Sequence, residues 1–353
     1  MIYLVKCYID NKKLRKYLLD IKTLNKFDTK KMYTIYDKWP EIAKNAFDSD
    51  VEPVDFKNIN HIVFAGMGGS GALGDIFSSI LSKTNVHVSV VKGYLLPKTV
   101  NSNTVVVPTS ISGNTVETIT ILEAAKKLDC KIIAFSSGGK IEDYCVYNRI
   151  YYRKIPQHHS PRASFTEFLY SMIKGLELII PIEKKDIKES IVQLEKLSKS
   201  ISSKNLSEDN PSLNLAEWIN GIPMIYYPWG LQAAAIRFKN SLQENAKMHA
   251  IAEDILEASH NGIVSWEKSS IVEPILLEGE DDYIKTKERW KILKEYFTEK
   301  NIDYREVYSI KGNILSKLIN LIYLLDYSSI YHAVLAKIDP TPILSIDFIK
   351  KNL

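Results

Sequence analysis

The chain has 353 residues, which is enough for two domains of about 150 residues each. Hydrophobic residues make up 45% and charged residues 25% of the chain, and it holds only 15 glycines and 13 prolines, so a disordered, collagenous or low-complexity protein is excluded for most of its length. The 46 basic and 42 acidic residues give a net charge of only +4 and form no basic stripe with interleaved aromatic side chains. We therefore expect no nucleic-acid partner, whereas an anionic small ligand fits this charge.

Cysteine usage and hydropathy indicate the compartment. Cys7, Cys130 and Cys145 have no Cys-x-x-Cys spacing and cannot all pair, which argues against a secreted disulfide scaffold and against a structural zinc site. We expect inert thiols in a reducing cytoplasm. Charged residues interrupt the first 19 residues, so we expect no signal peptide and no membrane span there. The apolar segment Ile314 to Val334 is also interrupted by charges and predicts a buried core helix.

From His61 onward, short β-branched runs alternate with helical patterns. The runs HIVFAG, VHVSVV, NTVVVPTS and KIIAFSS predict strands, and ALGDIFSSILSK and TVETITILEAAKKL between them predict helices. Strands that alternate with helices indicate a parallel sheet with helices on both faces. Residues Arg162 to Ile180 predict a long amphipathic helix that closes this half. The pattern gives little information about residues 1–35.

The second half of the chain repeats the same pattern after a polar stretch. Glu183 to Asn210 is rich in Lys, Glu and Ser and predicts a solvated connecting helix and loop. Strands are then predicted at IPMIYYPW, SSIVEPILLE and IDYREVYS, and helices at GLQAAAIRFKNSLQENAK, KTKERWKILKEYFTEK and Leu315 to Ile338. We therefore predict an α/β protein of two doubly wound domains, residues 1–182 and 211–353, joined by residues 183–210.

A glycine-rich loop, residues 66–71 (GMGGSG), follows the strand HIVFA and opens a helix. Backbone N–H groups and the positive end of a helix dipole converge there, which predicts an anion site that includes Gly69 and Ser70. The same glycines fit the dinucleotide fingerprint G-x-G-x-x-G, which requires an acidic residue at the end of the next strand. Lys92 and Gly93 stand at that point, so a NAD site is disfavoured and an NADP site remains an alternative.

A second loop, residues 109–115 (TSISGNT), follows the strand TVVVP and opens another helix. Ser110, Ser112 and Thr115 would present three hydroxyl groups to that helix N-terminus. Hydroxyl and free N–H groups can surround one phosphate without a metal, whereas a dinucleotide pyrophosphate needs only the first loop. Two such loops in one sheet favour a phosphate ester, while the alternative is that Ser110 and Ser112 are ordinary turn and cap residues.

In these two loops the sequence resembles the sugar isomerase (SIS) domain family, whose GMGGSG and S-x-SGNTxET loops bind phosphosugars. More narrowly, it is similar to the archaeal-type bifunctional phosphoglucose/phosphomannose isomerases, which hold two SIS domains in one chain. The motifs SPRASF, QENAK, ASHNGIVSW, LDYSSIYHA and DPTP carry this finer resemblance, which covers roughly residues 36 to 353. It implies a cytoplasmic homodimer that interconverts glucose 6-phosphate and fructose 6-phosphate, and mannose 6-phosphate as well, without a metal or a nicotinamide cofactor.

Such an isomerisation requires a base and a group that stabilises the enediolate. Glu244, in QENAK, is the candidate base, because a carboxylate can take a proton at neutral pH. Arg162, in SPRASF, is the candidate for enediolate stabilisation, because a fixed planar cation needs no reorganisation as charge develops. A surface ion pair for Glu244 and an ordinary helix-start residue for Arg162 are the alternatives. The neighbouring His158 and His159 are predicted to be surface residues.

The remaining candidates rest largely on the resemblance. His260 lies in a polar loop, and imidazole exchanges protons near pH 7; the resemblance implies that it opens the sugar ring in the active site of the other subunit. The resemblance also places a ring-opening lysine on the C-terminal segment, where we assign Lys350 with Lys351 as the competing neighbour. In DPTP it suggests Thr341 as the residue that lets both epimers react, and a proline-flanked turn is the alternative.

Two other functions stay open at this stage. One is another phosphosugar isomerase or an amidotransferase-like enzyme, although the latter would need an ammonia-supplying domain that this pattern lacks. The other is a non-catalytic phosphosugar-sensing regulator. Such a regulator would carry a DNA-binding helix-turn-helix, and neither the first 60 residues nor the tail contains a convincing one.

Overall fold

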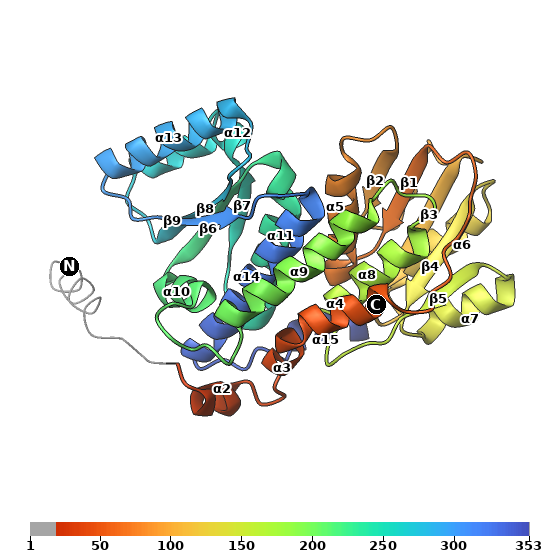
Figure 1. Ribbon diagram of the computed structural model, residues 1–353, viewed down its shortest axis with the longest axis horizontal. Coiled ribbons are helices and arrows are strands. Elements are labelled where there is room, and N and C mark those ends of the chain that lie inside the picture. The colour runs from red at the N-terminus through yellow and green to blue at the C-terminus, as the bar shows by residue number, and fades with distance from the viewer. Residues whose placement is uncertain (1–18, 353) are drawn as a thin grey trace.

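The computed structural model describes residues 19–352, which form two parallel sheets on either side of a central layer of helices (Figure 1). The first sheet has the strand order β2-β1-β3-β4-β5 and the second the order β7-β6-β8-β9. All neighbouring strands in both sheets pair in parallel. The predicted fold class, two doubly wound α/β domains, is therefore confirmed.

The first half of the chain contains all the strands predicted for it. Its elements in chain order are α2 (Ile21–Phe27), α3 (Tyr33–Asp37), α4 (Trp39–Phe47), β1 (His61–Ala65), α5 (Gly68–Leu81), β2 (His87–Val91), β3 (Thr104–Ser110), α6 (Val116–Lys126), β4 (Lys131–Ser136), α7 (Gly139–Asn148), β5 (Tyr151–Lys154) and α8 (Phe165–Leu176). The pair α7 and β5 was not predicted, because its sequence is polar and has no apolar run. Helix α8 is shorter than predicted at both ends.

The second half also follows the predicted order. Its elements are α9 (Lys184–Ile201), α10 (Pro211–Trp218), β6 (Ile222–Tyr227), the 3-10 turn η2 (Trp229–Leu231), α11 (Gln232–Ala246), β7 (Ile251–Asp254), α12 (Ile255–Ala258), the 3-10 turn η3 (Gly262–Glu267), β8 (Val272–Gly279), α13 (Ile284–Glu299), β9 (Arg305–Ser309), α14 (Ile314–Leu335) and α15 (Leu344–Lys351). The short strand β7 and helix α12 were not predicted.

Strand β1 illustrates how the layers are built. All five of its residues are buried. Ile62 and Phe64 belong to the central core between the two sheets, whereas Val63 and Ala65 belong to an outer core under α6 and α7. Side chains alternate between the two faces of a strand, so a strand covered on both faces must be apolar throughout.

The connecting helix α9 is packed into the protein, although the sequence predicted a solvated connector. Ile187, Ile191 and Leu194 are buried and join the central core, and the helix contacts α4 and α14. These residues recur at spacings of three and four, so they share one helix face, while the many charges occupy the other. The high charge content therefore concealed an amphipathic helix. The domain boundary at residues 183–210 stays a prediction.

Helix α14 is the buried core helix predicted from its sequence. It is apolar and long enough to span a membrane by length and composition, but 83% of its most apolar window is buried inside the protein. It packs against α9, α10 and α11 in the central layer (Figure 1). Its burial by other helices explains its composition without a lipid environment.

Two of the three cysteines lie within the described residues. Cys130 and Cys145 are free thiols, and burial raises the pKa of Cys145 to about 12. A thiol with such a pKa stays protonated and unreactive at neutral pH, which agrees with the prediction of inert cysteines. Cys7 lies outside the described residues.

Candidate active site

The glycine loop and the hydroxyl loop meet at the C-terminal edge of the first sheet. Strands β1 and β3 are neighbours, and the chain places β2 on one side of β1 and β3 on the other. Ligands of open α/β sheets bind at such a point, where the strand order reverses. A methyl group on Gly66 would lie 2.8 Å from the carbonyl oxygen of Thr109, so the close approach of the two loops requires glycine at this position.

The two helices that begin at these loops have no side-chain caps. Met67 and Thr115 occupy the N-cap positions of α5 and α6, and neither side chain makes a cap hydrogen bond to the described residues. In contrast, Asp20, Asn210 and Asn313 cap α2, α10 and α14. Other described helices, among them α11 and α13, also lack a side-chain cap, so it is the position of α5 and α6 at the C-terminal edge of the sheet that makes their N-termini candidates for an anion site.

Hydroxyl groups complete this candidate phosphate site. The hydroxyls of Ser110 and Thr115 are hydrogen-bonded to each other at 2.8 Å, and Ser110 Oγ accepts the N–H of Gly113 at 3.1 Å. The bond between the two hydroxyl groups uses one of their two hydrogens, so the other hydrogen remains to donate to a ligand. Ser70 Oγ accepts the N–H of Ile111 at 3.2 Å and thereby ties the glycine loop to the hydroxyl loop.

The other loop residues agree with this arrangement. Ser112 is exposed, and neither Ser112 nor Ser110 is the cap of α6, because Thr115 occupies that position. A methyl group on Gly69 would lie 4.0 Å from the carbonyl oxygen of Pro161. The glycine loop therefore lies beside the segment that leads into α8.

Arg162, in that segment, forms the centre of a second cluster and is only 5% exposed. Its Nε donates to Asn245 Oδ1 at 2.7 Å, and its Nη1 donates to the Glu244 carboxylate at 3.3 Å. Its Nη2 donates to the carbonyl oxygens of Pro340 and Thr341 at 2.6 and 2.9 Å. A guanidinium has five N–H donors, so one N–H of Nη1 has no acceptor among residues 19–352.

A buried ion pair supports the backbone of Arg162. Arg237 Nη2 donates to the Arg162 carbonyl oxygen at 3.0 Å and to the Asp326 carboxylate at 2.6 Å. Ser241 also donates to Asp326, and the Arg237 guanidinium lies 3.7 Å from the ring centre of Phe165. Removal of either charge would leave the other buried and unpaired, which is strongly destabilising.

The structure brings three of the predicted residues together and adds others. Arg162, Glu244 and Thr341 meet at the end of α11, where Glu244 is 26% exposed and so accessible to a ligand. Asn245 and Lys247 of the same motif also contact this cluster, although no role was predicted for either residue. Their position beside Glu244 in QENAK was the available signal.

His260 lies outside this cluster. It follows α12, is exposed, and its ring makes no hydrogen bond within residues 19–352. Strands β6 and β7 pair in parallel with Tyr227 opposite Asp254, so α12 begins beside the start of α11. Glu244 lies near the other end of this 15-residue helix, which is about 22 Å long. Within one chain, His260 and Glu244 are therefore at opposite ends of α11.

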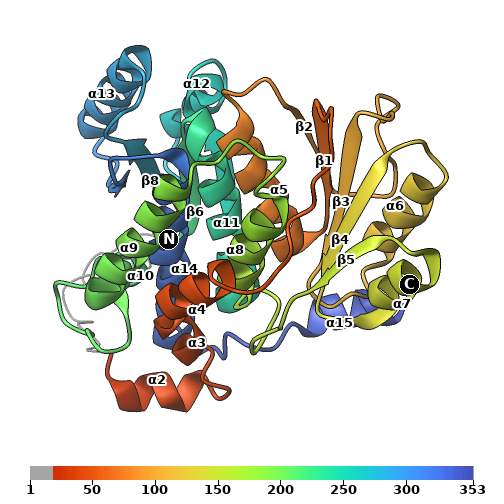
Figure 2. The same cartoon turned by 45° about the vertical axis from the view of Figure 1, so that its right-hand side comes forward.

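Lys350 and Lys351 lie in the last turn of α15, and both are exposed. The tail that carries α15 leaves the second domain after α14 and crosses toward the first sheet (Figure 2). Neither lysine forms an ion pair or hydrogen bond with the Arg162 cluster within the described part of the chain. The role of Lys350 stays a prediction.

One histidine of the SPRASF segment differs from its prediction. His159 is exposed as expected, but His158 is half-buried and its Nε2 lies 3.0 Å from the Glu167 carboxylate. The turn before α8 folds the segment back, so that Ser164 Oγ accepts the His158 N–H. The surface prediction for His158 was wrong because this local turn could not be foreseen.

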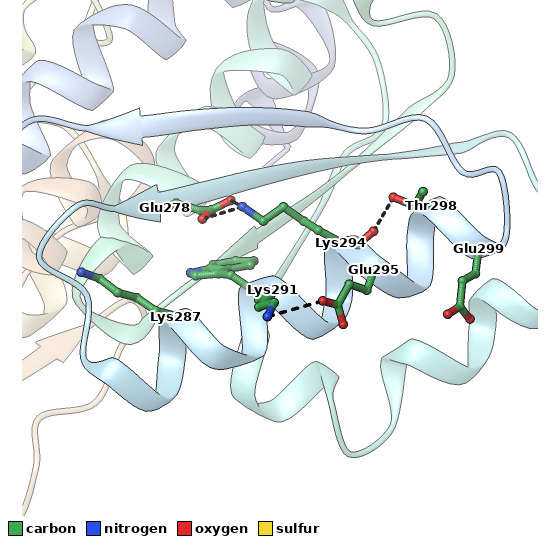
Figure 3. Close-up of a pocket in the computed structure, with 8 residues that line it drawn as sticks. Glu278, Lys287, Lys291, Lys294, Glu295, Thr298 and Glu299 are labelled. Atoms are coloured by element: carbon green, nitrogen blue, oxygen red, sulfur yellow. Dashed lines mark hydrogen bonds and ion pairs between the residues drawn. The ribbon is translucent and has the colours of Figure 1, made fainter.

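A hollow of about 630 Å³ lies elsewhere, between α13 and the outer face of β8 (Figure 3). Its lining residues are Glu278, Lys287, Trp290, Lys291, Lys294, Glu295, Thr298 and Glu299. Lys294 Nζ lies 3.0 Å from the Glu278 carboxylate, so the two innermost charges neutralise each other. The hollow contains none of the predicted site residues. Within residues 19–352, no group of three or more His, Cys, Asp or Glu side chains is placed to hold a metal ion.

Two family models and several curated relatives match this chain. Residues 208–353 match the family model of the bacterial phospho-glucose isomerase C-terminal SIS domain, and residues 55–166 match that of the SIS domain. A curated bifunctional phosphoglucose/phosphomannose isomerase from Caldicellulosiruptor bescii is 33% identical over 325 residues, which are 89% of this chain and 94% of the relative. A D-glucosamine-6-phosphate 4-epimerase from Sulfolobus acidocaldarius is 29% identical over 66% of this chain and 72% of its own length.

A solved structure supports the fold. A hypothetical protein from Thermus thermophilus superposes with a TM-score of 0.66 over 97% of this chain and 91% of its own, at 12% sequence identity. At this identity the match demonstrates a shared fold alone.

Inorganic phosphate is expected to bind at the two loops and to raise the melting temperature, since a ligand specific to the folded state stabilises it by about 2.7 kcal/mol at 100 times its Kd. Thr115→Val removes one hydroxyl and should weaken phosphate binding about fivefold, the effect of one hydrogen bond of about 1 kcal/mol. Melting curves at increasing phosphate concentrations measure this. Ser78→Ala, at the far end of α5, is the matched control, and an unchanged phosphate response in Thr115→Val would contradict the site.

Proposed function

Because the chain belongs to the family of bifunctional phosphoglucose/phosphomannose isomerases, we propose that it interconverts glucose 6-phosphate and fructose 6-phosphate, and mannose 6-phosphate as well. This membership confirms the resemblance found in the sequence. The observation that carries the proposal is the contact between the Glu244 carboxylate and the buried Arg162 guanidinium, which follows the Pro161 segment that lies beside the glycine loop. A base and a fixed cation beside a phosphate site are what an aldose–ketose isomerisation requires.

The geometry supports one assignment of roles. Residues 66–71 and 109–115 hold the phosphate of the open-chain sugar. Glu244 removes the proton from C2, and the electron pair of that C–H bond forms the enediolate. The unused N–H of Arg162 donates to the enediolate oxygen, so that charge develops against a donor already in place. Glu244 then returns the proton to C1 while the hydroxyl proton on O2 moves to O1, which yields the ketose from the aldose without net change in atoms or charge.

Ring opening has to precede this step, and we assign it to His260 with help from Lys350. Within one chain, His260 lies beside the start of α11 and Glu244 lies near its end, so His260 is too far away to reach a sugar bound at Glu244. We therefore propose a homodimer in which His260 of each subunit completes the site of the other. The proposal needs no metal and no nicotinamide cofactor, and it places the enzyme in the cytoplasm.

The first test replaces the base. Glu244→Gln keeps the shape of the side chain and removes its basicity, so the rate of fructose 6-phosphate formation should fall by about 10²–10⁴-fold. Turnover of glucose 6-phosphate and mannose 6-phosphate is followed in the presence of a chelator, together with loss of C2 deuterium to solvent. Phosphate binding should be retained, whereas the melting temperature should fall, because Glu244 balances the buried charge of Arg162.

Glu295→Gln, on the exposed face of α13, is the control for this substitution. Normal deuterium loss in Glu244→Gln would remove Glu244 from the role of base. Glucosamine 6-phosphate is a further substrate to test, because one relative carries the name of a 4-epimerase. If the wild-type protein acts on glucosamine 6-phosphate alone, and inverts its C4 centre, the proposed reaction is overturned.

The shared site predicts complementation between two inactive variants. A mixed dimer of Glu244→Gln and His260→Asn has one site with both defects and one site with none. Random exchange of subunits makes about half of the dimers mixed, so about a quarter of wild-type activity should return. Activity is measured after the two variants are co-expressed. If co-expression restores nothing although mixed dimers are isolated, His260 does not act across the interface.

The last test in this group concerns the choice of epimer. The Thr341 carbonyl accepts from Arg162, and its Oγ1 is buried without a hydrogen-bond partner among the described residues. A small side chain here leaves room for the enediol to rotate about C2–C3. Thr341→Gln should therefore lower kcat/KM for mannose 6-phosphate by about tenfold or more and leave glucose 6-phosphate within a few-fold. Thr341→Ser is the control, and equal losses on both substrates would contradict this role.

A further inference from the structure

Lys247 connects two parts of the candidate site. It ends α11 in the left-handed conformation with φ of 55°, and its N–H donates to Leu242. Its ammonium lies over three carbonyl oxygens: those of Glu244 at 2.6 Å, Asn245 at 3.3 Å and Pro340 at 3.2 Å. An ammonium has three N–H donors. All of them are used, so in this arrangement Lys247 has none left for a substrate.

Two of these carbonyls belong to the last turn of α11, where they have no partner within the helix. The third belongs to the tail, and the same Pro340 oxygen also accepts from Arg162 Nη2 at 2.6 Å. Lys247 therefore joins the helix that carries Glu244 to the turn that holds Arg162. Among the residues of this cluster, only Arg162 and Lys247 bind the turn at residues 340–341. Without the Lys247 contact, Arg162 alone would hold that turn.

We propose that Lys247 is a positioning residue of the isomerase, which fastens the turn at residues 339–341 to the end of α11 and so fixes Arg162 against Glu244. This inference rests on the proposed function. It assigns no contact between Lys247 and the sugar. If the inference is correct, the orientation of Arg162 against Glu244 depends on the number of N–H donors that Lys247 carries.

Stability alone does not explain a lysine at this position. A left-handed residue after a helix is most often glycine, which adopts this conformation without steric cost. Lys247 is exposed as a residue, while its ammonium contacts carbonyl oxygens and interacts with the charge of Arg162. The residue therefore has an unfavourable backbone conformation and an ammonium that faces another cation. Lys31, Arg149 and Lys337 adopt the same backbone conformation, so the contacts of the ammonium, and not the backbone, carry the inference.

The charges around Lys247 make the contact dependent on pH. Partial burial of the ammonium and the positive Arg162 lower the pKa of Lys247 to about 8, while the carboxylates of Asp339 and Glu244 act in the opposite direction. As pH rises through this value, the ammonium becomes an amine with two N–H donors, so it no longer donates to all three carbonyl oxygens and holds Arg162 and Glu244 less precisely. Activity should fall there.

Stability has the opposite sign in the same range. Between pH 8 and the ordinary lysine value of 10.5, the unfolded chain binds more protons at Lys247 than the folded protein does. The contribution of this group to the free energy of unfolding therefore rises with pH. A purely structural contact would lower activity and stability together, whereas the positioning role separates them.

The experiment measures kcat/KM for glucose 6-phosphate from pH 6.5 to 10 in the wild type, Lys247→Arg and Lys247→Met. The wild type should lose activity above pH about 8. Lys247→Arg stays charged over this range and should keep its activity to higher pH. Lys247→Met should lose at least about tenfold in kcat at all pH values, with KM and the melting temperature nearly unchanged, as expected for an exposed position. Lys239→Met, on the same helix, is the control.

Hydrogen exchange of residues 337–352 provides a readout that does not require turnover. At pH 7, protection of this tail should be lower in Lys247→Met than in the wild type, and Lys247→Arg should keep the wild-type protection. An alkaline loss of activity that persists in Lys247→Arg, or a melting temperature that falls with activity in Lys247→Met, would overturn the inference. A wild type that is inactive on both hexose phosphates would overturn the proposed function. Hydrogen exchange of residues 337–352 would then test, without turnover, whether Lys247 holds the tail.

Discussion

The guanidinium of Arg162 is buried between three segments that are far apart in the sequence: the start of α8, the end of α11 and the turn before α15. A buried cation is stable only when its donors are satisfied and its charge is balanced. These three segments must therefore pack together, and the candidate site forms where they meet. The charges of the whole cluster balance, with three cations, Arg162, Arg237 and Lys247, facing three carboxylates, Glu244, Asp326 and Asp339.

The two sheets have the same winding but differ in the loops at their C-terminal edges. In the first sheet, glycines and hydroxyls surround uncapped helix N-termini, which suits a phosphate. In the second sheet, the loop after β8 carries the carboxylates of Glu280, Asp281 and Asp282, two of which pair with Lys311 and Lys317. Carboxylates repel a phosphate. The second domain therefore contributes the candidate base, at the far end of α11, rather than a second phosphate site.

Local features of the sequence predicted most of the fold and the two loops, and contacts between distant segments account for what was missed. Apolar runs and glycine-containing turns are readable within a few residues, so the strands and the meeting of the two loops were predicted correctly, while the anion site stays a prediction. The amphipathic face of α9 was hidden by its charges, and the polar pair α7 and β5 had no apolar signal. The bond between Arg162 and Asn245 joins residues 83 apart, and that between Arg237 and Asp326 joins residues 89 apart, and no local pattern encodes either bond.

The length of α11 links catalysis to assembly in the proposed dimer. The helix begins at the C-terminal edge of the second sheet, beside the loop that carries His260, and Glu244 near its other end contacts Arg162, whose segment lies beside the glycine loop of the first sheet. A rigid helix of this length cannot bring both groups to one sugar within a chain. A twofold axis that places the His260 loop of one subunit at the Glu244 end of the other completes two identical sites at once. In that arrangement a monomer folds and binds phosphate but lacks a complete ring-opening site, so the activity per chain depends on protein concentration.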